Sequence, residues 1–379
     1  MSVRPRAGRQ PDLARLARLH GTPLLVVDCA VLRAQYRRLA AALPGVRLYY
    51  ALKPLPHPSV VRTLGVLGAG FDVATTGEID VVRAAGHPGS CCLHTHPIKK
   101  DADIRAALRR GVRRFVVDNA DEIVKFRPHR RRAELLLRVS FRNPTALIDL
   151  SRKFGCEPGD APVLLGLART LGIRVRGLSF HVGSQVADAD TYVAAIESCA
   201  GIMERSAASG TALDVLDIGG GFPIAYGTPV PSIERLCAPI RRSLRRLPAG
   251  IDVLAEPGRY LAGPAGTCVC SVVGRARRDG RWWYYLDDGI YGTFSGQVVD
   301  HVRYPVDSLG VRGRRESSVL AGPTCDSYDI VGEDVRLPPL AIGDLVVGRM
   351  MGAYTAASAT DFNFVPRARI VAVNERQGG

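Results

Sequence analysis

One repeated pattern constrains the fold of this chain more than any other feature. Between residues 46 and 260, short apolar runs end abruptly at residues with reactive side chains, and segments of helical period separate these runs. Alternating strands and helices predict parallel strands joined by right-handed crossovers. The clearest helical segments are 58–67, 77–85, 101–108, 162–171 and 189–207. The eight runs end, in order, at Lys53, Asp72, His94 with His96, Asp118, Arg138, His181, Asp217 and Glu256.

Eight such units predict an α/β fold of the (β/α)8 or TIM-barrel type. In that barrel the C-terminal ends of the strands surround one open mouth, and active-site groups come from several strands. An open doubly wound sheet gives the same alternation, but it gathers the catalytic groups at one switch point. Polar residues at the end of every strand therefore favour the barrel, which we expect over residues 29–261.

The pattern of apolar and polar residues changes after Gly263. Short β-rich runs such as CVCSVVGRA, WWYYLDD and DLVVGRM follow one another between Gly, Pro and charged turns. They predict a β-sandwich or small β-barrel domain over residues 262–379. The early run TPLLVVDCA is expected to join the same sheet, which adds residues 1–28 and makes the barrel an insertion. The first ten residues and the last few show no pattern of ordered structure.

Composition excludes several classes of function. The net charge of +15 suggests nucleic-acid binding as one possible function. However, only five of the 51 basic residues are lysines, and the arginines are spread along the chain. Solvated helix faces explain them better, and we expect no nucleic-acid partner. No secretory signal or membrane-spanning run is present, which favours the cytoplasm. The nine cysteines have no zinc-like spacing, so we expect free thiols and no metal.

Lys53 is a candidate nucleophile. It ends the run RLYYALK, and a lysine that loses hydration there has its pKa lowered toward the neutral amine that forms Schiff bases. Taken alone, it is better explained as a surface lysine at a strand end. The residues at the other strand ends decide between these two readings.

Three further motifs suit a phosphorylated, ring-shaped cofactor. In LDIGGGFP, Gly219, Gly220 and Gly221 follow a strand and can present backbone N–H groups to a phosphate. In HVGSQ, Ser184 can donate to the same phosphate, and the flat ring of His181 can stack on a cofactor. The alternative for His181 is a hydrogen-bonded core histidine.

The EPGR motif adds Glu256 and Arg259, which suit a pyridine nitrogen and a phosphate. The alternative is a simple salt bridge.

Eight colinear motifs carry a family resemblance. From about Thr22 to the C-terminus, the chain resembles the fold-type III pyridoxal-phosphate (PLP) decarboxylases, whose barrel is alanine racemase-like. Within them it resembles ornithine/lysine decarboxylases most, with diaminopimelate decarboxylase nearby. The resemblance implies PLP as cofactor and a homodimer with shared active sites. The motifs are YALK, GFDVAT, FHVGSQ, LDIGGGFP, AEPGRY, DDGIYGTF, GPTCDSYD and MGAYT.

The resemblance also implies roles for individual residues. Lys53 would carry the cofactor as a Schiff base, His181 would stack on its ring, and Glu256 would bond the pyridine nitrogen. A carboxylate there favours decarboxylation, whereas racemases of this fold carry an arginine. Cys325 and Asp326 would reach the partner's active site, where Cys325 returns a proton to the product. The other cofactor residues would be Asp72, Arg138, Ser184, Gly220, Gly221, Arg259 and Tyr354, and the other substrate residues Asp300, Tyr291 and Tyr354.

The motif that contains Asp326 bears on the substrate. Diaminopimelate decarboxylases typically have Glu after the Cys of this motif, whereas Asp326 follows Cys325 here. Together with Asp300, it suits the distal ammonium of a diamine-like side chain, because paired buried carboxylates need a cation. We therefore expect L-ornithine to be converted to putrescine, as in polyamine biosynthesis, with lysine to cadaverine as a secondary activity. The stretch RNPTALIDLSRKFG would form part of the pocket wall.

Three alternatives remain open from the sequence. One is diaminopimelate decarboxylase, and another is a specialised amino-acid decarboxylase of secondary metabolism with the same fold. The third is a catalytically inactive homologue that acts as a regulator, which the presence of Lys53, Glu256 and Cys325 disfavours.

Overall fold

A computed structural model describes residues 10–141 and 152–375. The expectations for both ends of the chain, and for most of RNPTALIDLSRKFG, concern residues outside these ranges. The chain divides into two compact units, which we call the barrel unit (35–223 and 230–260) and the β unit (up to residue 34, 224–229 and from 261 onward). No helix of the described residues is long and apolar enough to cross a bilayer.

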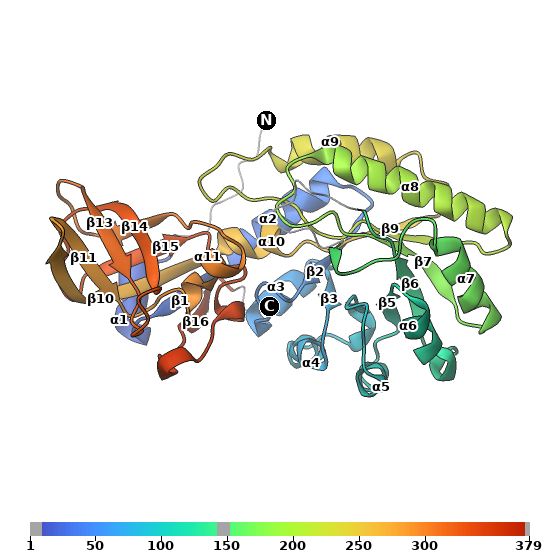
Figure 1. Ribbon diagram of the computed structural model, residues 1–379, viewed down its shortest axis with the longest axis horizontal. Helices are drawn as coiled ribbons and strands as arrows, with labels where there is room; N and C mark the ends of the chain where they lie inside the picture. The colour runs from blue at the N-terminus through green and yellow to red at the C-terminus, as the bar shows by residue number, and fades with distance from the viewer. Residues whose placement is uncertain (1–9, 142–151, 376–379) are drawn as a thin grey trace. The chain divides into compact units, whose positions relative to one another are not determined.

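The barrel unit confirms the predicted (β/α)8 architecture. Eight parallel strands pair in chain order, and the last closes on the first (Figure 1). Each strand ends at or just before one of the eight polar positions expected from the sequence. The strands are β2 (Arg47–Ala51), β3 (Gly70–Val73), β4 (Cys92–His94), β5 (Arg114–Val117), β6 (Glu134–Arg138), β7 (Val175–Ser179), β8 (Val215–Asp217) and β9 (Asp252–Ala255).

Local capping explains where several barrel helices begin. The side chains of Thr75, Asn119, Asp188 and Ser232 each accept a hydrogen bond from a backbone N–H of the first helical turn. Such caps fix the first turn of each helix next to its strand. The helices are α3 (Pro58–Gly65), α4 (Thr76–Ala84), α5 (Asp101–Arg109), α6 (Ala120–Lys125), α7 (Ala161–Thr170), α8 (Ala189–Ala208) and α9 (Ile233–Leu244), while α2 (Cys29–Ala42) and α10 (Arg259–Ala262) span the boundaries between the units.

The interior of the barrel is a packed core. Six strands each contribute one buried side chain to a single cluster, which only the inside of a closed barrel allows. Because side chains alternate along a strand, residues two positions away lie on the same inner face. The cluster thus separates the C-terminal mouth of the barrel from its N-terminal mouth. Its members are Tyr49, Leu93, Val116, Leu136, Val215 and Leu254.

The β unit confirms that an N-terminal strand joins the C-terminal sheet. Strand β1 (Leu24–Asp28) pairs antiparallel with β10 (Gly266–Arg278) and parallel with β16 (Arg369–Val373). The barrel sequence is therefore inserted between parts of one β unit. The remaining strands are β11 (Arg281–Leu286), β12 (Val306–Leu309), β13 (Glu316–Ala321), β14 (Ile330–Leu337) and β15 (Leu345–Arg349), and the short helix α11 spans Gly296–Val299.

Helix α1 (Leu13–His20) was not predicted from the sequence. Asp12 caps it by accepting from Arg15 N–H, and its apolar residues pack on the core beneath β1 and β10. Its sequence, LARLARLH, is short and rich in arginine, so the apolar face is easily mistaken for part of a basic tail. The apolar spacing of Leu13, Leu16 and Ala17 is the signal that predicts it.

Candidate active site

Lys53 lies just beyond β2 and faces the end of β3. Its Nζ is 3.4 Å from Oδ2 of Asp72, whose side chain is only 3% exposed against 43% for Lys53. The other carboxylate oxygen of Asp72 accepts a hydrogen bond from Thr95. Asp72 is thus held from both sides, and it positions the Lys53 amine. The expected depression of the Lys53 pKa stays a prediction.

The glycine turn after β8 packs tightly against its neighbours. A Cβ on Gly220 would lie 2.6 Å from the backbone oxygen of Glu256, and one on Gly221 would lie 2.5 Å from that of Gly183. Gly219 and Gly221 also have φ of +66° and +100°, a region that favours glycine. Only glycine therefore fits at these positions, and the turn lies against the loops that follow β7 and β9.

His181, at the end of the β7 segment, is buried beside this turn. Its Nδ1 accepts a hydrogen bond from Gly183 N–H at 3.1 Å. Burial, with the nearby cations Lys53 and Arg138, holds the pKa of His181 well below its usual range. The imidazole is therefore neutral, and its orientation is fixed by the backbone.

Ser184 and Arg259 were both predicted from the sequence to contact phosphate, and they meet in the structure. Arg259 Nη2 donates to Ser184 Oγ at 3.3 Å. The two residues come from the turns after β7 and β9, which flank the glycine turn after β8. A hydroxyl, a guanidinium and a glycine turn on three adjacent strands are groups that bind phosphate.

Glu256 shares its surroundings with a second carboxyl group, that of Asp217 at the end of β8. Burial raises the pKa of Glu256 well above its usual range, and the charges of Asp217 and Asp72 raise it further. Burial also raises the pKa of Asp217, to about 6. Glu256 is therefore the member of the pair that keeps a proton near neutral pH. Asp217 Oδ1 accepts from Gly219 N–H at 2.9 Å, which ties the pair to the glycine turn.

Several strand ends carry buried polar atoms that bond to no other described residue. They include Arg138 Nε on β6 and Asp217 Oδ2 on β8, together with His94 Nδ1 and Ser179 Oγ. Buried polar atoms are normally hydrogen-bonded, so such a group marks a place where a ligand or water is expected. Arg138 also lies over the ring of Phe154, with 5.5 Å between its Cζ and the ring centroid.

The other expected site residues lie in the β unit. The hydroxyl of Tyr291 donates to Asp326, whose second oxygen accepts from Tyr328 N–H. The Tyr291 hydrogen bond lowers the pKa of Asp326, which is partly exposed. Cys325 is exposed, and its thiol and N–H both donate to Asn363 Oδ1. The structure therefore brings Tyr291, Cys325 and Asp326 together at the surface of this unit.

Asp300 and Tyr354 occupy other positions in the β unit. Asp300 ends α11 and is only 3% exposed, and Tyr354 has a left-handed φ of +55°. Asp300 and Asp326 were predicted to form a buried pair, but of the two only Asp300 is buried. The free-energy cost of burying a carboxylate therefore applies to Asp300 and not to Asp326.

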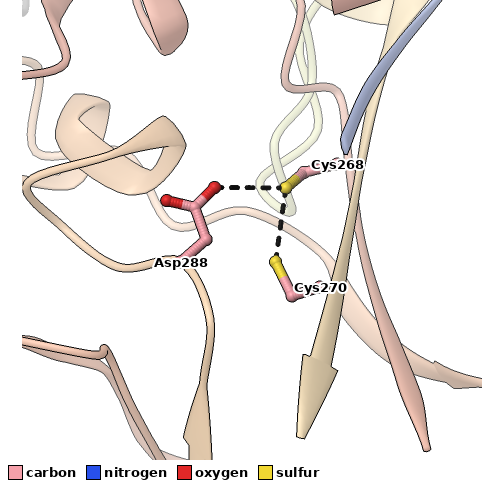
Figure 2. A group of neighbouring side chains, drawn as sticks. All are labelled: Cys268, Cys270 and Asp288. Carbon is pink, nitrogen blue, oxygen red and sulfur yellow. Dashed lines mark hydrogen bonds between the residues drawn. The ribbon is translucent and has the colours of Figure 1, made fainter. Parts of the chain in front are cut away.

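The cysteines 268 and 270 have a third potential ligand beside them (Figure 2). Their sulfur atoms lie 3.4 Å apart, and Cys268 Sγ is 3.6 Å from Asp288 Oδ2. The Cys268 thiol and burial raise the pKa of Cys270 well above its usual range, and burial raises that of Asp288 to about 6. Protonated thiols are poor metal ligands. Asp288 instead accepts from the N–H groups of Gly289 and Thr293, which shapes the turn that carries Tyr291.

Comparison with known proteins identifies this arrangement. The family model described as the pyridoxal binding domain of pyridoxal-dependent decarboxylases matches residues 29–263. The chain belongs to this family. A lysine/ornithine decarboxylase of Selenomonas ruminantium is 37% identical over 356 residues, which cover 93% of this chain and 90% of the relative. The ornithine decarboxylase of Neurospora crassa is 34% identical, covering 89% and 78%.

Solved structures agree with this assignment. The chain matches a lysine/ornithine decarboxylase of Vibrio vulnificus, solved with putrescine, at 52% identity and a TM-score of 0.91. The match covers 96% of this chain and 97% of the other. The same enzyme solved with cadaverine gives 53% identity and a TM-score of 0.92. The predicted family, fold and PLP dependence are confirmed.

The residues of the barrel mouth fit the cofactor of this family. The glycine turn with Ser184 and Arg259 suits the phosphate, and the carboxyl pair suits the ring nitrogen. The unbonded Arg138 Nε faces an environment where a further polar partner is expected. The assignment of each residue to a part of the cofactor stays a prediction.

Two positioning residues were not assigned a role from the sequence. Asp217 was recognised only as a strand end, and its interaction with Glu256 required the order of β8 and β9 around the barrel. Thr95, which donates to Asp72, lies in the HTHP segment after β4. Polar side chains at adjacent strand ends are the signal that could have found both.

We expect Gly220→Ala to weaken binding of PLP by at least about tenfold. The added Cβ would meet the Glu256 carbonyl at 2.6 Å, so the phosphate-binding turn would have to shift. Titration of the apoenzyme with PLP, followed by absorbance, measures the effect. Gly166→Ala is the matched control, since that helical position meets no atom within 4 Å and should be neutral or slightly stabilising. Unchanged affinity in Gly220→Ala would contradict the steric argument.

Proposed function

We propose that this decarboxylase acts on basic L-amino acids, with L-ornithine as its first substrate and L-lysine as its second. The observation that carries the reaction type is the buried Glu256 with Asp217, at the end of β9, the strand next to the one that leads to Lys53. When bound, PLP supplies an electron-accepting ring for the charge left by loss of CO2. A carboxylate beside the ring nitrogen favours that chemistry.

The roles of the barrel residues follow from their environments. Asp72 holds the Lys53 amine toward the mouth through their 3.4 Å contact. Glu256, whose raised pKa lets it keep a proton, would hold the ring nitrogen through that proton when PLP is bound. Neutral His181 offers a flat ring without adding positive charge. The site therefore places negative charge at the nitrogen end and donors at the phosphate end.

We expect Glu256→Gln to slow decarboxylation by about 10²–10³-fold while PLP remains bound. An amide cannot deliver a proton to the ring nitrogen or balance its charge, whereas Ser184 and Arg259 are untouched. The kcat for CO2 release and the absorbance of the holoenzyme are the two measurements. Asp217→Asn is the comparison: it keeps the acceptor for Gly219 N–H and should retain most of the activity. An unchanged rate in Glu256→Gln would place the ring nitrogen elsewhere.

Support for the substrate comes from the β unit. Asp326 is held as a carboxylate by Tyr291 and suits a distal ammonium, and the exposed Cys325 beside it suits proton return to the product. Asp, rather than Glu, at position 326 separates this chain from the diaminopimelate type. The Vibrio relative was solved with both putrescine and cadaverine, the products of ornithine and lysine decarboxylation.

L-ornithine should give the highest kcat/KM for CO2 release, L-lysine a lower but measurable value, and meso-diaminopimelate far less than either. One methylene changes transition-state binding by only about 1–3 kcal/mol, whereas a second carboxylate would face Asp326. A panel of amino acids assayed for CO2 release checks this order. If diaminopimelate proved to be the best substrate, the alternative of a diaminopimelate decarboxylase would replace the proposal.

We further propose a two-fold dimer in which the Cys325 loop completes the partner's site. Large apolar side chains surround this loop: Tyr328 is 67% exposed and Phe364 is 92% exposed, next to Asn363, which bonds Cys325. Exposed aromatic patches of this kind mark interaction surfaces. A self-complementary interface would bury both copies of the patch.

Mixing two inactive variants tests the shared site. Lys53→Ala and Cys325→Ala should each be nearly inactive and remain folded. After subunit exchange, half of the dimers are mixed and half of their sites carry neither change, so activity should recover to roughly a quarter of wild type. Failure to recover despite proven exchange would show that each chain builds its own site. Residual activity of Cys325→Ala must be measured first, because it sets the baseline.

We also propose that the enzyme is located in a reducing compartment such as the cytoplasm. All nine cysteines are free, and only Cys325 among them is exposed. Free thiols suit a reducing compartment.

A further inference from the structure

The N-terminal mouth of the barrel, opposite the Lys53 site, is strongly cationic. Arg47, Arg114 and Glu134 stand two residues before core positions of β2, β5 and β6, so their side chains lie on the inner face below the core. A hollow of about 860 Å³ opens there. Seven arginines and a single carboxylate, that of Glu134, are among its lining residues.

The acidic partners at this mouth neutralise only some of the arginines. Glu134 pairs with Arg174 at 2.9 Å and lies 3.7 Å from Arg114. Arg47 donates to the two carboxylate oxygens of Asp252 through Nε and Nη2. These contacts tie part of the wall into a rigid network.

Four guanidinium groups remain without a carboxylate partner among the described residues. They belong to Arg113, before β5, and to the consecutive arginines 130–132, before β6, and all four are exposed. Three of them donate to backbone carbonyl oxygens, which leave their charge uncompensated. The sequence scatters these arginines over two segments, but the barrel gathers them around one hollow.

A concave surface with this excess charge selects a particular ligand chemistry. Walls of low dielectric focus the field of like charges, which raises the local concentration of anions. Planar guanidinium groups bind phosphate oxygens in pairs, and several of them around a hollow match several phosphates on one small molecule. A nucleic-acid duplex presents its phosphates along an extended surface, whereas a hollow of this size suits a compact anion better.

We propose that the N-terminal mouth of the barrel binds a small polyphosphate anion, such as inorganic tripolyphosphate or the phosphate chain of a nucleoside polyphosphate. The ligand would contact Arg113 and Arg131 at the rim. The buried core cluster separates it from the phosphate-binding turn of the cofactor. This site does not depend on which amino acid the enzyme decarboxylates.

Calorimetric titration of the PLP-loaded enzyme with tripolyphosphate tests the site. We expect saturable binding with one site per chain, weakened by added salt. Arg113→Ala combined with Arg131→Ala should lower the affinity at least about tenfold, since each removes a charge-assisted hydrogen bond. Arg242→Ala combined with Arg245→Ala is the control: it removes the same charge from exposed positions at α9 and should change the affinity less than about twofold.

Three results would overturn the proposal. The first is no saturable binding at low salt, and the second is equal loss of affinity in both double variants, which would indicate diffuse attraction to a basic protein. The third is loss of the cofactor's absorbance during the titration, which would place the anion at the cofactor's own phosphate site. Thermal unfolding of both variants excludes misfolding as the cause of a change. The binding readout is independent of catalysis.

Discussion

The turn formed by Gly219, Gly220 and Gly221 packs backbone against backbone on the loops that follow β7 and β9. No side chain separates these three segments, and a single Cβ would force them apart. This contact places His181, Asp217 and Glu256 within one small volume. Glycine has no side chain, so these three backbone segments can approach closely. The orientation of His181 and the interaction of the two carboxyl groups both depend on this close approach.

The same closeness sets the electrostatics of the mouth. Two carboxyl groups in a buried space cannot both ionise cheaply, so the pKa values of Glu256 and Asp217 are both raised. Glu256 therefore keeps a proton near neutral pH, which avoids repulsion between the two groups. A pair of this kind suits a cofactor whose ring nitrogen carries a positive charge when bound. Burial, together with the nearby cations Lys53 and Arg138, lowers the pKa of His181 and keeps it neutral.

Much of this organisation is predictable from the sequence because barrel strands are short and end in polar residues. Lys53, Asp72 and Glu256 were recognisable as strand ends. The insertion of the barrel was predicted from the apolar run TPLLVVDCA, which contains β1. The pairing of Glu256 with Asp217 was not predictable, since it depends on which strands are neighbours. Helix α1 was missed because it is only eight residues long and its arginines resemble part of a basic tail. The partial exposure of Asp326 was not predictable either, because it depends on how the loop after β13 lies in the β unit.

Side chains alternate along each barrel strand, so every strand turns residues inward at both mouths of the barrel. The charges of these inward residues differ between the two mouths. At the C-terminal mouth, the strand ends carry four carboxyl groups, among them that of Asp72, against the two cations Lys53 and Arg138, and the field suits a cationic ring and amine. At the N-terminal mouth, the inward residues Arg47 and Arg114 are cationic, and the loops add more arginines than Glu134 can balance. Unbalanced like charges weaken a fold by self-repulsion. Their retention at the mouth opposite the catalytic one is therefore better explained by an anion that offsets the repulsion than by stability of the empty barrel.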